Sequence, residues 1–393
     1  MTEKLQTALR TGENYYIEFK NEIISNNELS KEIVSFANAE GGVIYIGISD
    51  NGLVNGVSPD PSLEEKIMNI LRNNCSPSLN AKVEWINYED KHVLQLEVEK
   101  GRFKPYSTKD GDFYIRVGST KRKASREELS RLLQSSGYFQ FDNTSIGHSN
   151  IDDLEKGILS EYFKDIYKID IYDRKDVPDF ENLLLNTKIL TISENKLCPS
   201  IAGLLTFGKK PQDFLFHTGI IFARINGYEI YDEIADSKQL EGRLPELIEQ
   251  CLTLFNLYNK KQSIFENGRR IDQYDYPAKV FREIIVNAVC HRNYSISGSR
   301  IRVIILNDRY EVRSPGRLPN TITIDNIKQG ASFLRNQAIF KFLNHYGYIE
   351  NLGRGIPLSI RETISHSGIM PEFSEEGEEF VVRIYKKRLP LPT

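Results

Sequence analysis

Residues 34–52 read VSFANAEGGVIYIGISDNG, and this stretch decides the fold expected for the first third of the chain. Apolar side chains at helical spacing predict a helix over 27–40, which two consecutive glycines then end. The run 43–49 is apolar and β-branched, as in a buried strand. Asp-Asn-Gly at 50–52 predicts a tight turn. A helix that leads directly into a buried strand indicates a mixed α and β fold.

The same kind of pattern continues on the C-terminal side of this stretch. Helices are predicted at 62–74 and 125–134, and strands at 81–89, 92–100 and 112–118. Ser125 and Glu128 form a capping box at the start of the second helix. These elements are expected to complete one domain.

The whole chain has 393 residues, enough for two or three domains. We expect an α/β (α+β) architecture with a first domain over 1–137, a polar linker over 138–150, a middle α/β domain over 151–272, and a last domain over 273–393. Within the middle domain, IAGLLTFG (201–208) and GIIFARING (219–227) are interpreted as strands.

Composition excludes several classes of protein. The chain is 40% apolar and 27% charged, and it has no run of about 20 apolar residues that would span a bilayer. Its N-terminus has no apolar segment of a secretory signal. Four cysteines stand far apart without a CxxC pair, so neither a zinc site nor a redox motif is indicated, and free thiols are expected. We therefore expect a cytoplasmic protein without membrane partners.

A basic segment lies between residues 100 and 126. Nine Lys or Arg face two Asp there, so the segment carries +7 while the rest of the chain carries −10. A local basic surface on an acidic body would suit nucleic-acid phosphates, although a merely solvated surface is equally compatible. The candidate nucleic-acid contacts are Lys20, Lys104, Arg116, Lys121, Arg122 and Lys123.

Three carboxylates in the first domain are candidate metal ligands. Glu13 and Glu18 flank a short predicted strand, and Asp50 ends the strand at 43–49. Converging carboxylates would bind Mg²⁺ or Mn²⁺ and promote phosphodiester cleavage, since hard cations prefer oxygen ligands. The alternative is that they are solvated, with Asp50 serving its turn.

These residues give the first third a resemblance to the Schlafen-type AlbA-like domain. It is carried by the Glu13…Glu18-Phe19-Lys20 pattern, by 34–42, by 45–57 and by the strand at 113–119, and it covers about residues 5–135. The resemblance implies nucleic-acid binding. In Schlafen nucleases the positions of Glu13, Glu18 and Asp50 form a metal-dependent site that cuts structured RNA such as tRNA. Prokaryotic members with the same acidic pattern are described as DNA-binding or transcriptional regulators.

A second constellation lies in FREIIVNAVCHRNY (281–294). Glu283, Asn287 and His291 recur at i, i+4 spacing on one face of a predicted helix whose other residues are mostly apolar. A carboxylate there could activate water, and an Asn oxygen could hold Mg²⁺ on phosphates. Alternatively, both side chains bond to nearby backbone. Glycine loops at 314–319 and 351–356 would let backbone amides approach phosphate.

This ordered set resembles the GHKL (Bergerat) ATP-binding fold, an α/β sandwich. The resemblance implies that Glu283 is the general base, that Asn287 is the metal ligand and that Gly353-Arg354-Gly355 is the second glycine box. Gly316 in the first box and Arg335 in a lid over 320–346 complete the candidate nucleotide site; Arg335 is otherwise a surface salt-bridge residue. Ser314 stands where such ATPases carry the adenine-reading Asp. Related proteins with AlbA-like domains are often labelled "RecG-like", but this chain has no Walker A loop.

The sequence thus predicts a nucleic-acid-binding protein that responds to a nucleotide, with ATP the expected ligand and a homo-oligomer the expected assembly. The leading hypothesis is a metal-dependent nuclease that acts on RNA or DNA. The alternatives are an ATP-responsive, non-enzymatic transcriptional regulator and a GHKL-type ATPase.

Overall fold

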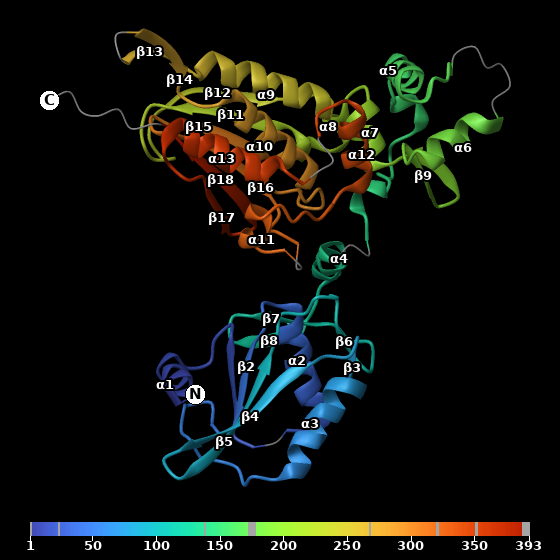
Figure 1. The fold of residues 1–393 in the computed structure, drawn as a ribbon. Helices are drawn as coiled ribbons and strands as arrows, with labels where there is room; N and C mark the ends of the chain where they lie inside the picture. Colours follow the sequence, from blue (N-terminus) through green and yellow to red (C-terminus); the bar gives the residue numbers. More distant parts are fainter. Residues whose placement is uncertain are drawn as a thin grey trace. The chain divides into compact units, whose positions relative to one another are not determined.

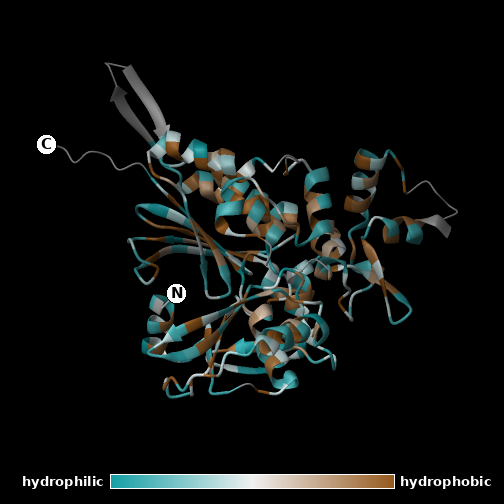
Figure 2. Cartoon of the chain, turned by 60° about the horizontal axis from the view of Figure 1, so that its bottom comes forward, coloured by the Kyte–Doolittle hydropathy of each residue, from teal (hydrophilic) through white to brown (hydrophobic). Residues whose placement is uncertain are grey.

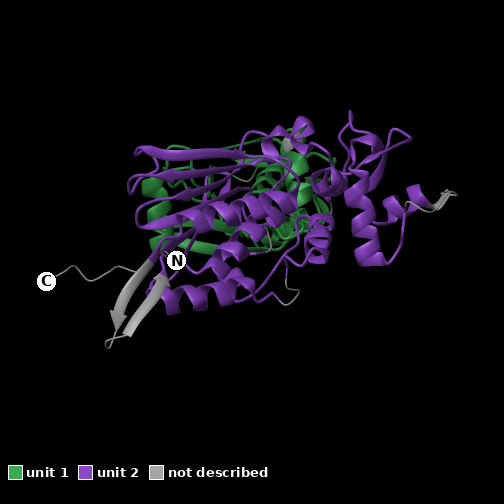
Figure 3. Cartoon of the chain, turned by 90° about the horizontal axis from the view of Figure 1, so that it is seen from above, with its two compact units in different colours: residues 1–139 green, residues 140–393 purple. Residues whose placement is uncertain are grey.

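The protein divides into two compact units, Met1–Phe139 and Gln140–Thr393 (Figures 1 and 3). Each unit has its own sheet and hydrophobic core, so the predicted mixed α and β architecture is confirmed. The computed structural model describes residues 2–22, 24–136, 139–171, 178–266, 269–319, 322–349 and 353–386.

A four-stranded sheet organises the first unit. Its strands run in the order β1 (Ile17–Lys20), β2 (Gly42–Ile46), β5 (Lys91–Val98) and β4 (Ala81–Tyr88). Strand β1 is parallel to β2, and the other neighbours are antiparallel. The other elements are α1 (Thr2–Thr11), α2 (Asn26–Asn38), α3 (Pro61–Asn73), β3 (Cys75–Ser76), β6 (Ser107–Thr108), β7 (Tyr114–Val117), β8 (Thr120–Lys123) and α4 (Arg126–Ser135).

Strand β2 separates two layers of core. Ile44 and Ile46 pack with α2 and α3, whereas Tyr45 packs with α1 on the opposite face, as the two-residue repeat of a strand requires. Gly42 allows α2 and β2 to approach closely, since a Cβ there would lie 2.6 Å from the Tyr16 carbonyl oxygen and closer still to the Phe36 ring. The predicted helix, turn and strand are present, and the Ser125–Glu128 capping box is confirmed.

A six-stranded sheet organises the second unit. Its strands run in the order β12 (Ile234–Leu240), β11 (Ile220–Ile225), β15 (Ile301–Ile305), β16 (Arg309–Pro315), β18 (Glu379–Tyr385) and β17 (Glu372–Glu376). Its main helices are α9 (Leu244–Tyr258), α10 (Ala278–His291), α12 (Gln337–His345) and α13 (Gly355–Ser367). Helices α9, α10 and α13 cover one face of the sheet (Figure 1).

Smaller elements surround this layered body. They are η1 (Phe141–Asn143), η2 (Ile151–Asp153), α5 (Lys156–Tyr162), η3 (Phe163–Tyr167), α6 (Pro178–Asn186), β9 (Leu190–Ser193), β10 (Lys196–Pro199), α7 (Ile201–Phe207), α8 (Pro211–Phe214), η4 (Phe216–Thr218), β13 (Lys261–Glu266), β14 (Arg269–Tyr274) and α11 (Ile324–Lys328). Strands and helices carry both apolar and polar residues (Figure 2). In this unit, buried apolar residues from Leu154 to Ile384 form the main core.

The expected boundary between a middle and a last domain at 272/273 differs from the structure. Strand β11, from the expected middle domain, pairs in parallel with β15, from the expected last domain. Their side chains share one core, and residues 140–393 form a single compact unit. Most of the expected linker over 138–150 also belongs to this unit, since Asp142 on η1 is fully buried.

The run at 201–208, interpreted as a strand, is instead mostly the helix α7. Ser200 caps it by accepting a hydrogen bond from the Gly203 amide at 2.8 Å. All seven helical residues are buried, so the run has no polar face to reveal a helical period.

Among the described residues, no helix is long and apolar enough to cross a membrane.

Candidate functional site

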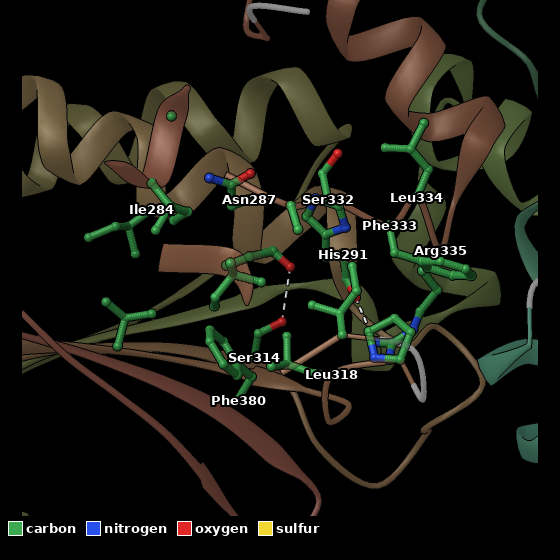
Figure 4. A pocket seen from close by; sticks show the side chains of 18 of the residues that line it. Ile284, Asn287, His291, Ser314, Leu318, Ser332, Phe333, Leu334, Arg335 and Phe380 are labelled. Atoms are coloured by element: carbon green, nitrogen blue, oxygen red, sulfur yellow. Dashed lines mark hydrogen bonds between the residues drawn. The ribbon is translucent and has the colours of Figure 1, made fainter. Parts of the chain in front are cut away.

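A cavity of about 440 Å³ lies in the second unit, between α10, the end of β16, the segment 316–335 and the start of α13 (Figure 4). Apolar side chains form most of its wall, including Ile284, Val312 and Phe380. The six residues that the sequence predicted for nucleotide binding all line this one cavity: Glu283, Asn287, Gly316, Arg335, Gly353 and Gly355.

Helix α10 presents a polar stripe to the cavity. Glu283, Asn287 and His291 follow one another at four-residue spacing, while most of the rest of the helix is buried in the core. The Asn287 amide nitrogen Nδ2 donates to Glu283 Oε1 at 2.8 Å. Eight residues of helix rise separate Glu283 from His291 by about 12 Å, so the stripe is long enough to line a nucleotide-sized ligand.

Two glycines bring the α13 loop against the carboxylate of Glu283. A Cβ on Gly355 would lie 1.7 Å from Glu283 Oε1, so no larger residue fits there without displacement. Gly353 has φ +61°, and its added Cβ would lie 2.9 Å from the Gly330 carbonyl oxygen. The first turn of α13, whose amides favour negative charge, therefore faces the same space as Glu283.

Arg335 closes the other end of the cavity. Its Nη1 donates to the His291 carbonyl oxygen at 2.7 Å, and its Nη2 donates to the carbonyl oxygen of Arg317. Gly316 makes room for it, since a Cβ there would lie 2.5 Å from Arg335 Nη1. Within the described parts of the chain no carboxylate forms an ion pair with Arg335, and these two hydrogen bonds both go to backbone carbonyl oxygens.

Arg335 and His291, at this end of the cavity, differ in their charge at neutral pH. Burial lowers the pKa of Arg335 to about 10, so the guanidinium keeps its charge at neutral pH. Burial and the nearby Arg335 charge lower the pKa of His291 to about 4, so the imidazole is neutral. Ser314 donates through Oγ to the Ala288 carbonyl oxygen at 2.9 Å and brings no charge. The cavity thus offers a cation at one end and the Glu283–Asn287 pair at the other.

The candidate metal ligands of the first unit have other partners. Glu18 is buried and forms ion pairs with Lys20 and, at 2.6 Å, with Arg116. Glu13 accepts a hydrogen bond from the Phe19 amide at 2.9 Å. Its pKa is raised by burial and also by the charges of Glu18 and Asp50, so the three carboxylates are within electrostatic reach. In the described residues, no group of three or more Asp, Glu, His or Cys is arranged to hold a metal ion.

Glu32 is an important residue that the sequence interpretation missed. It is 1% exposed and pairs with Lys121 at 2.6 Å and with Arg116 and Lys20 at 3.5 Å. Its sequence neighbourhood held a signal, because it directly precedes the apolar pair Ile33-Val34 in α2, where residues 32–38 are all buried. A carboxylate on a buried face needs a partner.

The six candidate nucleic-acid contacts do not form one exposed basic surface. Lys104 and Arg116 are 2% and 4% exposed, and Lys20 and Lys121 are half-buried in the ion pairs with Glu18 and Glu32. Arg122 and Lys123 are exposed, and they pair with Glu128 and Asp112. Apart from Asp112, these acidic partners (Glu18, Glu32 and Glu128) lie outside the basic segment, so the net charge of the segment alone overstated its positive field.

Lys104 provides a pH-dependent prediction. Its Nζ donates to the Ala39 carbonyl oxygen at the end of α2, and burial lowers its pKa to about 7. An unfolded lysine titrates near 10.4, so between about pH 7 and 10 the unfolded chain binds more protons and stability rises with pH. The free energy of unfolding of wild type relative to Lys104→Met should therefore increase by about 1.4 kcal/mol per pH unit in this window.

Urea denaturation at pH 7 and pH 9 measures this difference, with Lys109→Met as a control because Lys109 is exposed. Equal pH dependence in wild type and Lys104→Met would contradict the buried, partly deprotonated lysine.

Comparison with known protein families finds one match within each unit. Residues 13–125 match the family described as "Schlafen, AlbA_2", and residues 298–384 match the one described as "Putative ATP-dependent DNA helicase recG C-terminal". The second match begins after α10, so Glu283 and Asn287 lie outside it. No curated protein matches the chain significantly.

Two solved structures are similar to parts or all of the chain. The crystal structure of the DIP2311 protein from Corynebacterium diphtheriae is 20% identical, with a TM-score of 0.49, and the match covers 98% of this chain and 80% of that one. The N-terminal domain of a putative ATP-dependent DNA helicase RecG-related protein from Nitrosomonas europaea is 19% identical, with a TM-score of 0.24, over 32% of this chain and 92% of that one.

The first match covers most of the motifs that carried the Schlafen resemblance. The second match covers the glycine loops of the ATP-binding resemblance but not its 281–294 motif. The first unit thus contains a region that matches the Schlafen AlbA_2 family, and the second unit contains a region that matches the recG C-terminal family.

Proposed function

We propose that this protein binds nucleic acid through its first unit and that a nucleotide in the cavity of the second unit controls this binding. One observation carries the proposal. Six residues predicted for nucleotide binding come from four predicted motifs, and they line a single cavity of about 440 Å³. The two matched families, one Schlafen-type and one described as a DNA helicase C-terminal domain, support the link between nucleotide and nucleic acid.

The side chains have distinct roles in this proposal. The Asn287 Nδ2 donates to Glu283, which leaves Asn287 Oδ1 as an acceptor that would hold a phosphate-bound Mg²⁺. Glu283 would accept a proton from an attacking water if the nucleotide is hydrolysed. The α13 amides after Gly353 would bind phosphate, and Arg335 would contact the opposite end of the ligand.

Calorimetric titration of the full chain with Mg²⁺·ATP and Mg²⁺·GTP tests the proposal. Wild type should bind one of them, and Asn287→Ala should weaken binding about tenfold or more through loss of the metal ligand, a cost of about 1.4 kcal/mol. Asn256→Ala, on the exposed face of α9, is the control and should bind as wild type does. The proposal fails if wild type binds neither nucleotide.

The same preparations report control of nucleic-acid binding. Fluorescence anisotropy with labelled tRNA, single-stranded DNA and duplex DNA gives affinities with and without nucleotide. A wild-type affinity that changes with nucleotide, and an Asn287→Ala affinity that does not, is the expected result. ATP turnover in the absence of any such change would favour the simple ATPase instead.

A metal-dependent nuclease is the second candidate function. The observation that favours it is the raised pKa of Glu13, to which the charges of Glu18 and Asp50 contribute after burial. A divalent cation would have to compete with Lys20 and Arg116 for Glu18. Because Glu18 supports the fold, Glu13→Gln and Asp50→Asn are the better variants. Cleavage of tRNA or DNA in Mn²⁺ that is lost with EDTA and in both variants would establish the nuclease. Cleavage that is unchanged in the variants would exclude these carboxylates as its site. Binding of nucleic acid without cleavage would favour a regulator.

A further inference from the structure

A buried carboxylate connects the cavity of the second unit to the segment that follows the first unit. Asp142 lies on η1, directly after the unit boundary at 139/140, and is 0% exposed. The η1 turn packs between α7 and α12. The segment is held in place on its other side as well, since the Ile201 amide donates to the Thr144 carbonyl oxygen at 2.8 Å.

Asp142 caps a helix almost 200 residues away in sequence. Its Oδ2 accepts from the amides of Ala338 at 2.8 Å and Ile339 at 3.2 Å, which are the second and third residues of α12. A helix normally receives these two bonds from its own N-cap side chain. The N-cap of α12 is Asn336, and its side chain makes no such bond.

Asn336 is used elsewhere. Its Nδ2 donates to the carbonyl oxygens of Cys290 and Arg292, both at 2.8 Å, and the side chain is 1% exposed. These carbonyls end α10, the helix that carries the polar stripe of the cavity. The preceding residue, Arg335, binds the His291 carbonyl oxygen at the same helix end and lines the cavity. The end of α10, the start of α12 and η1 are therefore joined by one set of buried hydrogen bonds.

The charge of Asp142 makes this connection sensitive to the position of α12. Burial raises the pKa of Asp142 to about 6, and the amides of Ile339 and Ala338 oppose that rise. In the described structure no Lys or Arg forms an ion pair with it, and its Oδ1 has no hydrogen-bond partner. The N-terminus of α12 is thus the main stabiliser of the carboxylate. Movement of α12 would require η1 to follow or leave a charge buried without partners.

We propose that Asp142 positions the Arg335 wall of the cavity and transmits its occupancy to the segment joining the two units. The inference rests on the proposed function, because it concerns regulation of that same cavity. Ligand contact with Arg335 shifts or stiffens Asn336 and α12, and Asp142 carries this change to residues 140–144. Asp142 acts through Arg335 and is a positioning residue, not a residue that contacts the ligand.

The test measures thermodynamic coupling in the full chain. The coupling factor is the ratio of nucleic-acid dissociation constants without and with Mg²⁺·ATP, and it equals the factor by which nucleic acid changes ATP affinity. Asp142→Ala should reduce the factor to about 1 and weaken ATP binding about 2- to 30-fold, as expected for loss of a cap. Asp142→Asn keeps an oxygen acceptor and should retain part of the coupling. Asp153→Ala, which removes a half-buried carboxylate bonded to the Asn150 amide, should leave the coupling factor unchanged.

Amide hydrogen exchange supplies a second measurement. It distinguishes transmission through Asp142 from a purely structural role of this residue. Mg²⁺·ATP should slow exchange at 337–345 and at 140–146 in wild type, and only at 337–345 in Asp142→Ala. Unaltered coupling, or equal protection of 140–146, in folded Asp142→Ala overturns the inference while leaving the proposed function intact. Wild type that binds ATP without any coupling also overturns it. Absence of nucleotide binding in wild type contradicts both the proposed function and this inference.

Discussion

Replacing Arg116 with methionine is expected to destabilise the first unit by about 3–5 kcal/mol, the usual cost of removing one partner from a buried ion pair. The guanidinium bonds Glu18 at 2.6 Å and lies 3.5 Å from Glu32. These two carboxylates are 6% and 1% exposed, so neither can recover hydration when Arg116 is absent.

Arg116 also holds the backbone of the first strand. It donates to the carbonyl oxygens of Asn14, Tyr15 and Ile17, and its guanidinium lies 4.2 Å from the centroid of the Phe36 ring. Methionine would keep some contact with the ring and lose every hydrogen bond. The variant should therefore loosen β1 and its contact with α2 more than the rest of the unit.

Tryptophan fluorescence can follow this unit alone. The chain has one tryptophan, and it is Trp85 on β4 of the first unit. Its transition in urea should shift to lower concentration in Arg116→Met. Arg122→Met is the matched control, because the Arg122–Glu128 pair is half-exposed and should contribute at most about 1 kcal/mol. If Arg116→Met unfolds at the wild-type midpoint, the buried network is not a stabilising feature of the fold.

Replacing Gly355 with alanine is expected to weaken nucleotide binding strongly while the protein stays folded. The new Cβ would lie 1.7 Å from Glu283 Oε1, so the carboxylate or the first turn of α13 must move. Overpacking of this kind costs about 1–3 kcal/mol. If nucleotide binding needs the original arrangement, that cost appears as a loss of affinity of about 5- to 150-fold.

The measurement is calorimetric titration with Mg²⁺·ATP, together with the melting temperature of each variant. Gly298→Ala is the matched control, since a Cβ there meets nothing within 4 Å and its φ is not positive. It should bind ATP as wild type does. Wild-type affinity in Gly355→Ala would show that the approach of α13 to Glu283 is not part of the binding site.

Much of this protein was determined by its sequence alone, through patterns that act over a few residues. The helix, glycine pair and strand over 27–49 follow from side-chain period and backbone freedom, and the capping box at Ser125 follows from one local exchange of hydrogen bonds. The four-residue spacing in α10 is sufficient by itself to place Glu283, Asn287 and His291 on one helix face, and all three line the cavity. The regions 34–57 and 314–356, which carried part of the two resemblances, fall within the two family matches.

The tertiary structure decided which charges are buried and which segments belong together. The sequence is compatible with Arg116 as a surface cation, but packing places it between Glu18 and Glu32, both of which are distant in the chain. Asp142 likewise lies in an apparent linker, and only the fold brings it to the start of α12. A residue's charge and a short apolar run such as that of α7 are compatible with several environments, and the sequence does not rank them. Burial and long-range pairing make that choice, because desolvation makes one arrangement of charges far more stable than the others.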